Sequence, residues 1–149
     1  MQQRVRSAVA VLVLSVVCLA CGGGGHGGGP TEPSGQRLQV TLIAVPVGGN
    51  LLEAAVSFDG REVSRVDWSR TGGSCALFCG LAVDVAGISA GEHTIRFTVV
   101  RQTRATVDYF VNYGGVLTDP ATGRQDPVNS PQQSVRLQAG QSASFTLRV

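Results

Sequence analysis

Cys75 and Cys79 are the side chains whose type and spacing most readily support chemistry in this chain of 149 residues. Two thiols held so close along the chain form a disulfide in an oxidising compartment, so we expect a bond between them. Zinc is a poor alternative because it needs about four ligands, and the remaining soft donors outside the N-terminal cysteines are His26 and His93. Haem attachment fails because Gly80 stands where that motif requires a histidine. We expect neither a metal nor a cofactor.

The segment between these cysteines carries two large apolar side chains, Leu77 and Phe78. On one interpretation, the disulfide pins them as a rigid apolar tip that is offered to a partner. On the other, one of them packs into the end of the domain; we favour this second interpretation because single apolar residues in loops are ordinary. The sequence thus predicts a packed loop and leaves partner binding open.

Histidine is the side chain most suited to acid–base catalysis near neutral pH. His26 lies in a glycine run that cannot hold it in place, and His93 precedes an alternating segment with no activated nucleophile evident beside it. The chain also lacks the nucleophile elbow, the phosphate-binding loop and the zinc-protease motif. We expect no catalytic residues and a protein that is not an enzyme.

Residues 114–132 contain three oxygen donors of the kind that calcium accepts, Asp119, Asp126 and Asn129. Their spacing matches no EF-hand, and calcium normally takes six or more oxygen ligands. We expect a solvated loop here. Long segments without secondary structure are usually functional or disordered, and the sequence does not decide between the two.

Three aromatic side chains, Trp68, Tyr109 and Tyr113, have the chemistry of a platform on which a sugar ring stacks. Each of them, however, shares the parity of a neighbouring apolar row, such as Val107 and Val111 for the two tyrosines. Positions of one parity lie on one face of a strand, so we expect these aromatic residues in the core.

Strands are the elements that would position these residues, because apolar side chains recur at every second position from residue 38 onward. No segment beyond the N-terminal leader keeps apolar residues at helical spacing over three turns. The alternating rows are centred on residues 38–42, 52–58, 66–68, 81–85, 95–99, 107–113, 135–137 and 145–149. Short strands without a helix predict an all-β sandwich over residues 36–149, with the last two rows forming an additional C-terminal hairpin.

The first twenty residues differ from the rest of the chain. A short basic start with Arg4 and Arg6 precedes an apolar run over residues 8–20. As a helix this run would rise about 20 Å, which is short of the roughly 30 Å of a bilayer core. The pattern is typical of a signal peptide, removed after Ala20.

The end of this leader, Cys-Leu-Ala-Cys-Gly at residues 18–22, resembles the lipobox of bacterial lipoproteins. The resemblance implies that Cys21 receives a diacylglycerol and becomes the first residue of a membrane-anchored protein. Cys18 and Leu19 depart from the usual pattern, and the alternative is a secretory signal that leaves Cys21 as a free thiol. Because Gly22 is not the aspartate that signals inner-membrane retention, the resemblance implies the outer membrane in bacteria with two membranes.

Residues 21–35 form a linker rich in glycine and proline, which we expect to act as a flexible tether. Removing the leader takes away two of the twelve arginines and leaves ten, against ten acidic residues, so the mature chain is neutral. A neutral chain has no general attraction for phosphate backbones, and nucleic acid is not an expected partner.

The middle of the chain resembles a bacterial immunoglobulin-like domain over residues 37–113. Trp68 follows Val56 at the distance that separates the strand-C tryptophan from the strand-B core residue, and residues 89–95 resemble the E–F corner. The resemblance implies an immunoglobulin-like sandwich in which His93 replaces the corner tyrosine and Ile95 the second cysteine. The inter-sheet disulfide of that family is missing.

Together these features predict an envelope lipoprotein whose sandwich serves binding, adhesion or scaffolding. Its expected partners are the membrane, through lipid on Cys21, and a protein or glycan at the loop ends. The alternative function is a carbohydrate-binding module or a small envelope hydrolase, because this scaffold hosts many unrelated roles.

Overall fold

The computed structural model describes residues 35–149. The predicted signal peptide, Cys21 and all but the last residue of the predicted tether lie outside the described residues. In the part that the structure describes, no helix has the length and apolar character needed to cross a bilayer.

The described chain forms nine strands and one short 3-10 helix. The elements are β1 (Gln36–Val47), β2 (Leu51–Phe58), β3 (Arg61–Asp67), η1 (Trp68–Thr71), β4 (Cys79–Ile88), β5 (Glu92–Gln102), β6 (Val107–Thr118), β7 (Gln125–Asn129), β8 (Gln133–Leu137) and β9 (Ser142–Arg148). The all-β prediction is confirmed.

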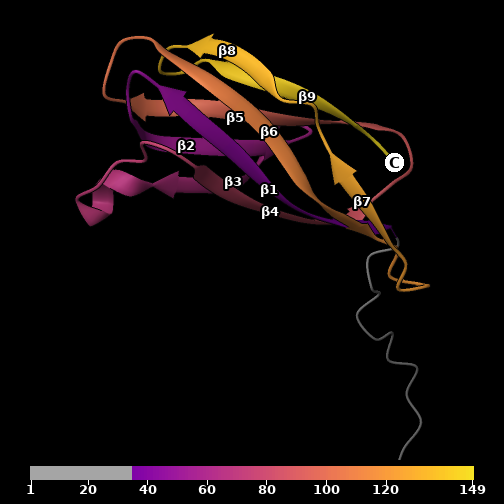
Figure 1. Ribbon diagram of the computed structural model, residues 1–149. Coiled ribbons are helices and arrows are strands. Elements are labelled where there is room, and N and C mark those ends of the chain that lie inside the picture. Colours follow the sequence, from indigo (N-terminus) through magenta and orange to yellow (C-terminus); the bar gives the residue numbers. More distant parts are fainter. Residues whose placement is uncertain (1–34) are drawn as a thin grey trace, which may run out of the picture. The chain divides into compact units, whose positions relative to one another are not determined.

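The strands form two antiparallel sheets that pack face to face (Figure 1). One sheet has the order β4-β1-β6-β7, with β8 also paired to β6, and the other has the order β3-β2-β5-β9. β7 and β8 share one edge of the long strand β6, β7 pairing with residues 114–118 and β8 with residues 107–111. We call these the five-stranded and the four-stranded sheet.

The core lies between the sheets and is built from the alternating apolar rows of both. Aromatic rings join the layers, since Phe97 meets Tyr109 edge to face at 5.9 Å and Tyr113 meets Phe145 at 5.7 Å. Such edge-to-face pairs add to the stabilisation from apolar burial. Most of the rows predicted from parity are buried, but the row in β2 begins with Leu51 in place of the predicted Leu52. Four predicted members are only partly buried against the core, namely Val66, Trp68, Val135 and Val149.

Asp59 and Gly60 form a two-residue hairpin turn between β2 and β3. Asp59 and Gly60 both have positive φ, 47° and 82°, as a two-residue hairpin turn requires. The Asp59 side chain also accepts a hydrogen bond from the backbone N–H of Thr94 at 2.8 Å. The turn thereby links β2 to the start of β5.

The predicted C-terminal hairpin is wrong in its pairing, because β8 and β9 belong to different sheets. β8 pairs with β6, and β9 pairs with β5. The physical reason is that β7 covers only half of the edge of β6, and β8 completes that edge. The edge of β5 is left for β9, and the segment at residues 138–141 crosses from one sheet to the other.

The predicted loop over residues 114–132 is also largely wrong. β6 continues to Thr118, and β7 returns beside it after a turn at residues 119–124. The glycines at 114 and 115 and Pro127 conceal the alternation in the sequence. They do not prevent pairing, because β7 is an edge strand, where proline is tolerated.

The strand pairing departs from the immunoglobulin order at two points. One is that β2, which carries Val56, pairs with β5, which carries Ile95, whereas strands B and F of an immunoglobulin domain lie in opposite sheets. The other is that β2 and the segment that leads to Trp68 (β3) pair with each other in one sheet. In the immunoglobulin arrangement, strands B and C also lie in opposite sheets. The β-sandwich is established, and the immunoglobulin-like correspondence finds no support at either pair.

Candidate interaction site

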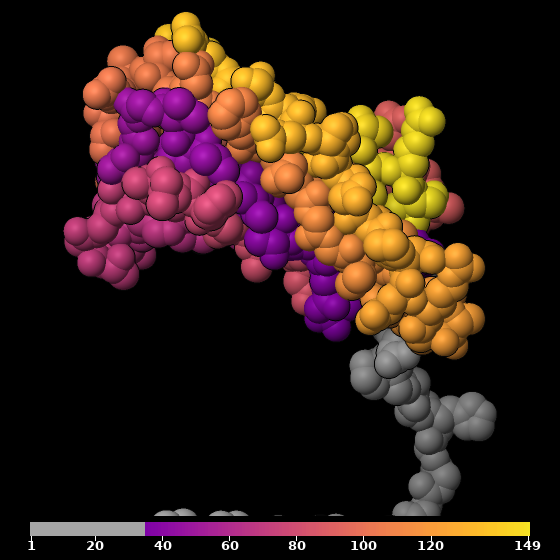
Figure 2. All heavy atoms as spheres, in the orientation of Figure 1, coloured from indigo at the N-terminus to yellow at the C-terminus, as the bar shows by residue number. Residues whose placement is uncertain are grey.

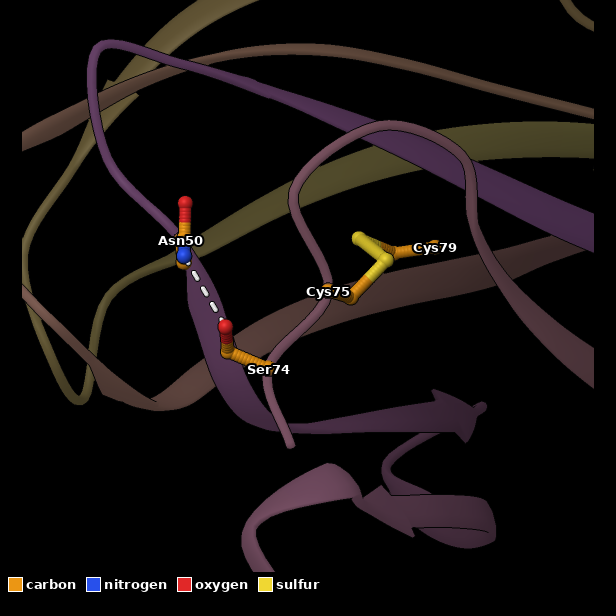
Figure 3. Close-up of a disulfide and its surroundings, with 4 residues drawn as sticks. All are labelled: Asn50, Ser74, Cys75 and Cys79. Atoms are coloured by element: carbon orange, nitrogen blue, oxygen red, sulfur yellow. Dashed lines mark hydrogen bonds between the residues drawn. A yellow bond between two sulfur atoms is a disulfide. The ribbon is translucent and has the colours of Figure 1, made fainter. Parts of the chain in front are cut away.

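Cys75 and Cys79 form the predicted disulfide, with their Cα atoms 5.7 Å apart (Figure 3). Cys79 is fully buried as the first residue of β4. Cys75 exchanges two backbone hydrogen bonds with Leu51, at 2.8 and 2.9 Å. The bond therefore closes a short loop whose two ends are both fixed to the sheets.

A second contact holds the same loop. The side-chain amide of Asn50 donates to the Ser74 hydroxyl at 2.9 Å, as Figure 3 shows. The backbone N–H of Asn50 in turn donates to the Thr103 hydroxyl, also at 2.9 Å. The loop before the disulfide is thus tied to the β1–β2 and β5–β6 connections, which makes it a supported element.

Leu77 and Phe78 do not pack into the end of the sandwich, so that prediction is wrong. Their exposed fractions are 69% and 77%. The space at this end is already filled by Leu51 and Cys79, which are both fully buried. The loop consequently turns its two large apolar side chains outward.

Two further exposed apolar side chains lie at this end of the molecule. Val47 is the last residue of β1, and Phe110 on β6 lies opposite Val45 of β1. Val45, Val47 and Phe110 share the outer face of the five-stranded sheet, because residues two apart or directly opposite point the same way. We call Val47, Leu77, Phe78 and Phe110 the apolar tip; these four are the exposed large hydrophobic residues among residues 35–149.

Val47 and Phe110 are the two members of the apolar tip that we did not predict, although the alternation of the sequence contains a signal for both. Phe110 falls between the buried Tyr109 and Val111, and Val47 follows the buried Pro46. Each is an apolar residue at a position whose parity predicts solvent. Such off-parity residues identify an apolar outer face.

The outer face of the four-stranded sheet carries a connected network of ion pairs, whereas the outer face of the five-stranded sheet carries two separate pairs, Arg37–Asp84 and Arg136–Asp108. Glu53, only 13% exposed, accepts from Arg65 at 2.8 Å and from Arg101 at 2.7 Å. Arg101 also donates to Asp67 at 2.8 Å. Hydrogen bonds, first from Arg101 and then from Arg65, hold the pKa of Glu53 below its usual value. The apolar tip lies on the side of the five-stranded sheet, since its members are on or next to strands β1, β4 and β6.

The apolar tip and the start of the domain lie at opposite ends of β1. Gln36 pairs with Ile88 at one end, and Ala44 pairs with Cys79 at the other. At about 3.3 Å per residue, the twelve residues of β1 span roughly 36 Å. Figure 2 shows the magenta residues around 70–80 at the end opposite to the orange turn between β6 and β7. Residues 70–80 and 119–124 thus do not form one surface.

His93 is a structural residue at the corner between β4 and β5, as predicted. Its Nδ1 lies 2.7 Å from an Asp59 carboxylate oxygen, its Nε2 lies 2.9 Å from the backbone oxygen of Ser89, and its ring stacks on Phe58. The hydrogen bond with Asp59 is the main cause that raises the pKa of His93 above its usual value. Both nitrogens face acceptors, so the ring can donate at both positions only when it is protonated.

The aromatic residues do not form a platform for sugars. Tyr109 is fully buried and Tyr113 nearly so, as predicted, and Trp68 is partly buried against the core. The Tyr109 hydroxyl donates to the Gln102 side chain at 2.8 Å, and burial raises its pKa to about 12. The rings consequently have no common exposed face.

The three oxygen donors of residues 114–132 serve the local chain. Asp119 accepts from the Ala121 backbone at 2.9 Å and so shapes the turn after β6, while Asp126 forms an ion pair with Arg124 at 2.9 Å. Asn129 lies at the far end of β7. Over residues 35–149, no group of three or more histidine, cysteine, aspartate or glutamate side chains is placed to hold a metal ion.

Comparisons of the chain with protein-family models, with curated proteins and with solved structures find no match. The candidate site consequently rests on the geometry described above.

Proposed function

We propose that this protein is a lipid-anchored component of a bacterial cell envelope whose β-sandwich is non-catalytic and binds a partner through the apolar tip. The observation that carries the proposal is the exposure of Leu77 and Phe78 on a loop held by the Cys75–Cys79 disulfide. Contiguous exposed apolar side chains commonly mark interaction sites.

Physical chemistry favours binding at this loop. Burying an exposed leucine or phenylalanine side chain contributes about 1.5–3 kcal/mol each. A loop fixed by a disulfide and by the Asn50–Ser74 hydrogen bond loses little conformational freedom on binding. Because Leu77 and Phe78 are exposed in the free protein, their side chains are not buried when the chain folds. A partner that covers them therefore gains the full free energy of their burial.

The proposed anchor suits this arrangement. A flexible chain of the length of residues 22–35 averages roughly 20 Å end to end, so lipid on Cys21 would hold the domain close to the membrane. The domain begins at Gln36, and the apolar tip lies at the other end of β1. The apolar tip would accordingly lie at the end of the domain that is farther from the point where the tether joins it, and the anchoring membrane is the outer membrane if the bacterium has two.

Intact-mass spectrometry of the purified protein tests the anchor. The expected result is a chain that begins at Cys21 and carries a diacylglycerol, and a Cys21→Ser variant should be released from the membrane fraction. A mature protein with an unmodified thiol at residue 21 would contradict the lipid anchor.

Photo-crosslinking in cells tests the binding. A photoreactive amino acid at Ala76, an exposed position beside Leu77, should capture a specific partner. The matched control is the same amino acid at Thr122, which is exposed on the turn at the opposite end. Identical products from the two positions, or none from either, would count against binding through the apolar tip.

A further inference from the structure

The edges of the two sheets differ in how they are protected from pairing with other chains. A sheet edge presents unpaired backbone N–H and C=O groups, and natural proteins block such edges with charges, proline or bulges. β3 carries four charged residues along its length, and β7 contains Pro127. The pairing of β1 with the edge strand β4 contains a register shift. Each of these edges has one of the usual protections.

β9 is less protected than β3, β4 and β7, and its one charge, Arg148, lies at its end; β8, the remaining edge strand, carries Arg136. The seven residues of β9 pair with β5 in an uninterrupted register, and β9 has no proline and no charge before Arg148. Val149 and Gly91 exchange backbone hydrogen bonds at 2.9 and 3.0 Å, which fixes the alternation of inward and outward groups. The backbone groups of Ser144, Thr146 and Arg148 therefore face the open side.

One half of this edge is already occupied. The Gln133 side chain of β8 donates to the backbone oxygen of Ser144 at 3.2 Å. Within residues 35–149, no hydrogen bond reaches the outward N–H and C=O groups of Thr146 and Arg148. The open part of the edge thus runs toward the C-terminal end of β9.

A groove of about 680 Å³ lies beside this open part. One wall is β9, with Thr146, Leu147 and Arg148, and the other is β7; Figure 1 shows the C-terminus next to β7. The lining includes Val128, which is partly buried, and Tyr113, which is nearly buried. The volume of the groove is typical of a site for a small ligand. Its β9 wall, however, presents unpaired backbone N–H and C=O groups.

We propose that the open part of the β9 edge, at Thr146 and Arg148, binds an extended segment of a partner polypeptide as an added strand. The backbone of that segment pairs with the outward groups of Thr146 and Arg148, and one of its side chains enters the groove beside Val128, where the lining is more polar than apolar. Strand addition of this kind draws affinity from backbone hydrogen bonds and specificity from pockets for alternate side chains. The site lies away from the apolar tip and does not depend on it.

A single strand fits this edge better than a second copy of the chain. A second copy would bring both of its sheets alongside, and the neighbouring edge of the five-stranded sheet is blocked by Pro127 on β7. A single extended segment needs only the edge of β9 and the groove.

Selection from a phage-displayed library of random dodecapeptides on the purified full chain tests the proposal. Enriched peptides should bind with a Kd that rises at least tenfold in a Thr146→Pro variant, because proline removes an outward donor without removing a hydrogen bond to β5. The control is the Leu77→Ser, Phe78→Ser double variant, which should bind the same peptides with unchanged Kd. On the unsubstituted protein, the peptide should slow amide hydrogen exchange at Thr146 and Arg148; this readout does not depend on the folding of the proline variant.

Three results would overturn the proposal. The first is a library that yields no enriched peptide. The second is a set of peptides that leave exchange at Thr146 and Arg148 unchanged, or that lose affinity in the double variant instead. The third is a dimer in sedimentation equilibrium that Thr146→Pro dissociates, which would assign the edge to a second copy of the chain.

Discussion

The His93 side chain lies at the start of β5 and contacts two other parts of the chain. One is the turn between β2 and β3, which is distant in sequence, and the other is the segment just before β5. The two ring nitrogens of His93 meet Asp59 in the β2–β3 turn and the backbone of Ser89 before β5. The His93 side chain is only 11% exposed, whereas Asp59 is 46% exposed. The contact therefore closes one end of the sandwich, and when His93 is protonated it is an ion pair that solvent partly screens.

The pH dependence of stability should reveal this contact. The pKa of His93 is raised in the folded state, so its contribution is fully present below the unfolded value of about 6.5 and is lost as pH rises through the folded value. The pKa of Asp59 is lowered, and its contribution is lost only in acid, as pH falls through the folded value. Urea unfolding should give about 1 kcal/mol more stability at pH 5.5 than at pH 9. A His93→Gln variant that keeps the full difference would contradict this account.

Residue chemistry was predictable from the sequence where local spacing decides it. The Cys75–Cys79 bond follows from spacing and is present, and His93, which the immunoglobulin resemblance placed at a corner, contacts Ser89 beside the connection between β4 and β5. The exposure of Leu77 and Phe78 was not predictable, because it depends on Leu51 and Cys79 filling the end of the core. That competition for space arises only when distant strands come together.

At the scale of elements, the pairing of β6 with β1 depends on Gly115, which lies opposite Val40. A Cβ on Gly115 would lie 2.6 Å from the Cα of Val40 and closer still to the backbone oxygen of Gln39. Backbone atoms cannot move aside as a flexible side chain can. The two central strands of the five-stranded sheet can pair here only because residue 115 has no side chain.

Gly115→Ala should lower the free energy of unfolding by about 2 kcal/mol or more, because the new methyl group forces β6 away from β1. Gly114→Ala is the matched control, since a Cβ there meets nothing within 4 Å, and it should change stability by less than about 0.5 kcal/mol. Urea denaturation of both variants measures the difference. Equal effects at the two positions would show that close approach is not the cause.

The disulfide stabilises the start of β4 by restricting the unfolded chain. Closing so short a loop contributes about 2 kcal/mol in the chain-entropy description, so reduction should lower the free energy of unfolding by that amount. A Cys75→Ser variant, which breaks the bond and keeps the buried Cys79 thiol in place, should match the reduced protein and show no response to reductant. A reduced protein as stable as the oxidised one would mean that the Leu51–Cys75 backbone pair alone holds the loop.

Strand positions were predictable from alternation, but partners were not. The sequence pattern places β8 and β9 close together along the chain, and a local hairpin is the simplest expectation. Their pairing with different sheets follows from which edges β6 and β5 leave open. β7 escaped prediction because glycines and a proline interrupt the period of two.

The whole molecule has two ends with different properties. At one end the domain begins and the Asp59–His93 contact closes the corner; at the other, the disulfide loop carries the apolar tip. The outer face of the four-stranded sheet carries a connected network of ion pairs, whereas apolar side chains extend over the outer face of the five-stranded sheet near the apolar tip. This polarity along β1 favours a binding surface at the end of the domain that is farther from the proposed tether.

The Leu77→Ser, Phe78→Ser double variant should leave stability unchanged to within about 0.5 kcal/mol, because both side chains are exposed and contribute little to the core. Thermal and urea unfolding measure this. A loss of more than about 2 kcal/mol would show that the loop packs into the domain in solution.

The most direct test of the central claim is photo-crosslinking from residue 76 in cells, with and without the Leu77→Ser and Phe78→Ser substitutions. We expect a specific crosslinked partner with the native apolar tip and its loss in the double variant at equal protein abundance. The same partner captured with equal yield from both proteins would contradict the assignment of the apolar tip as the binding surface.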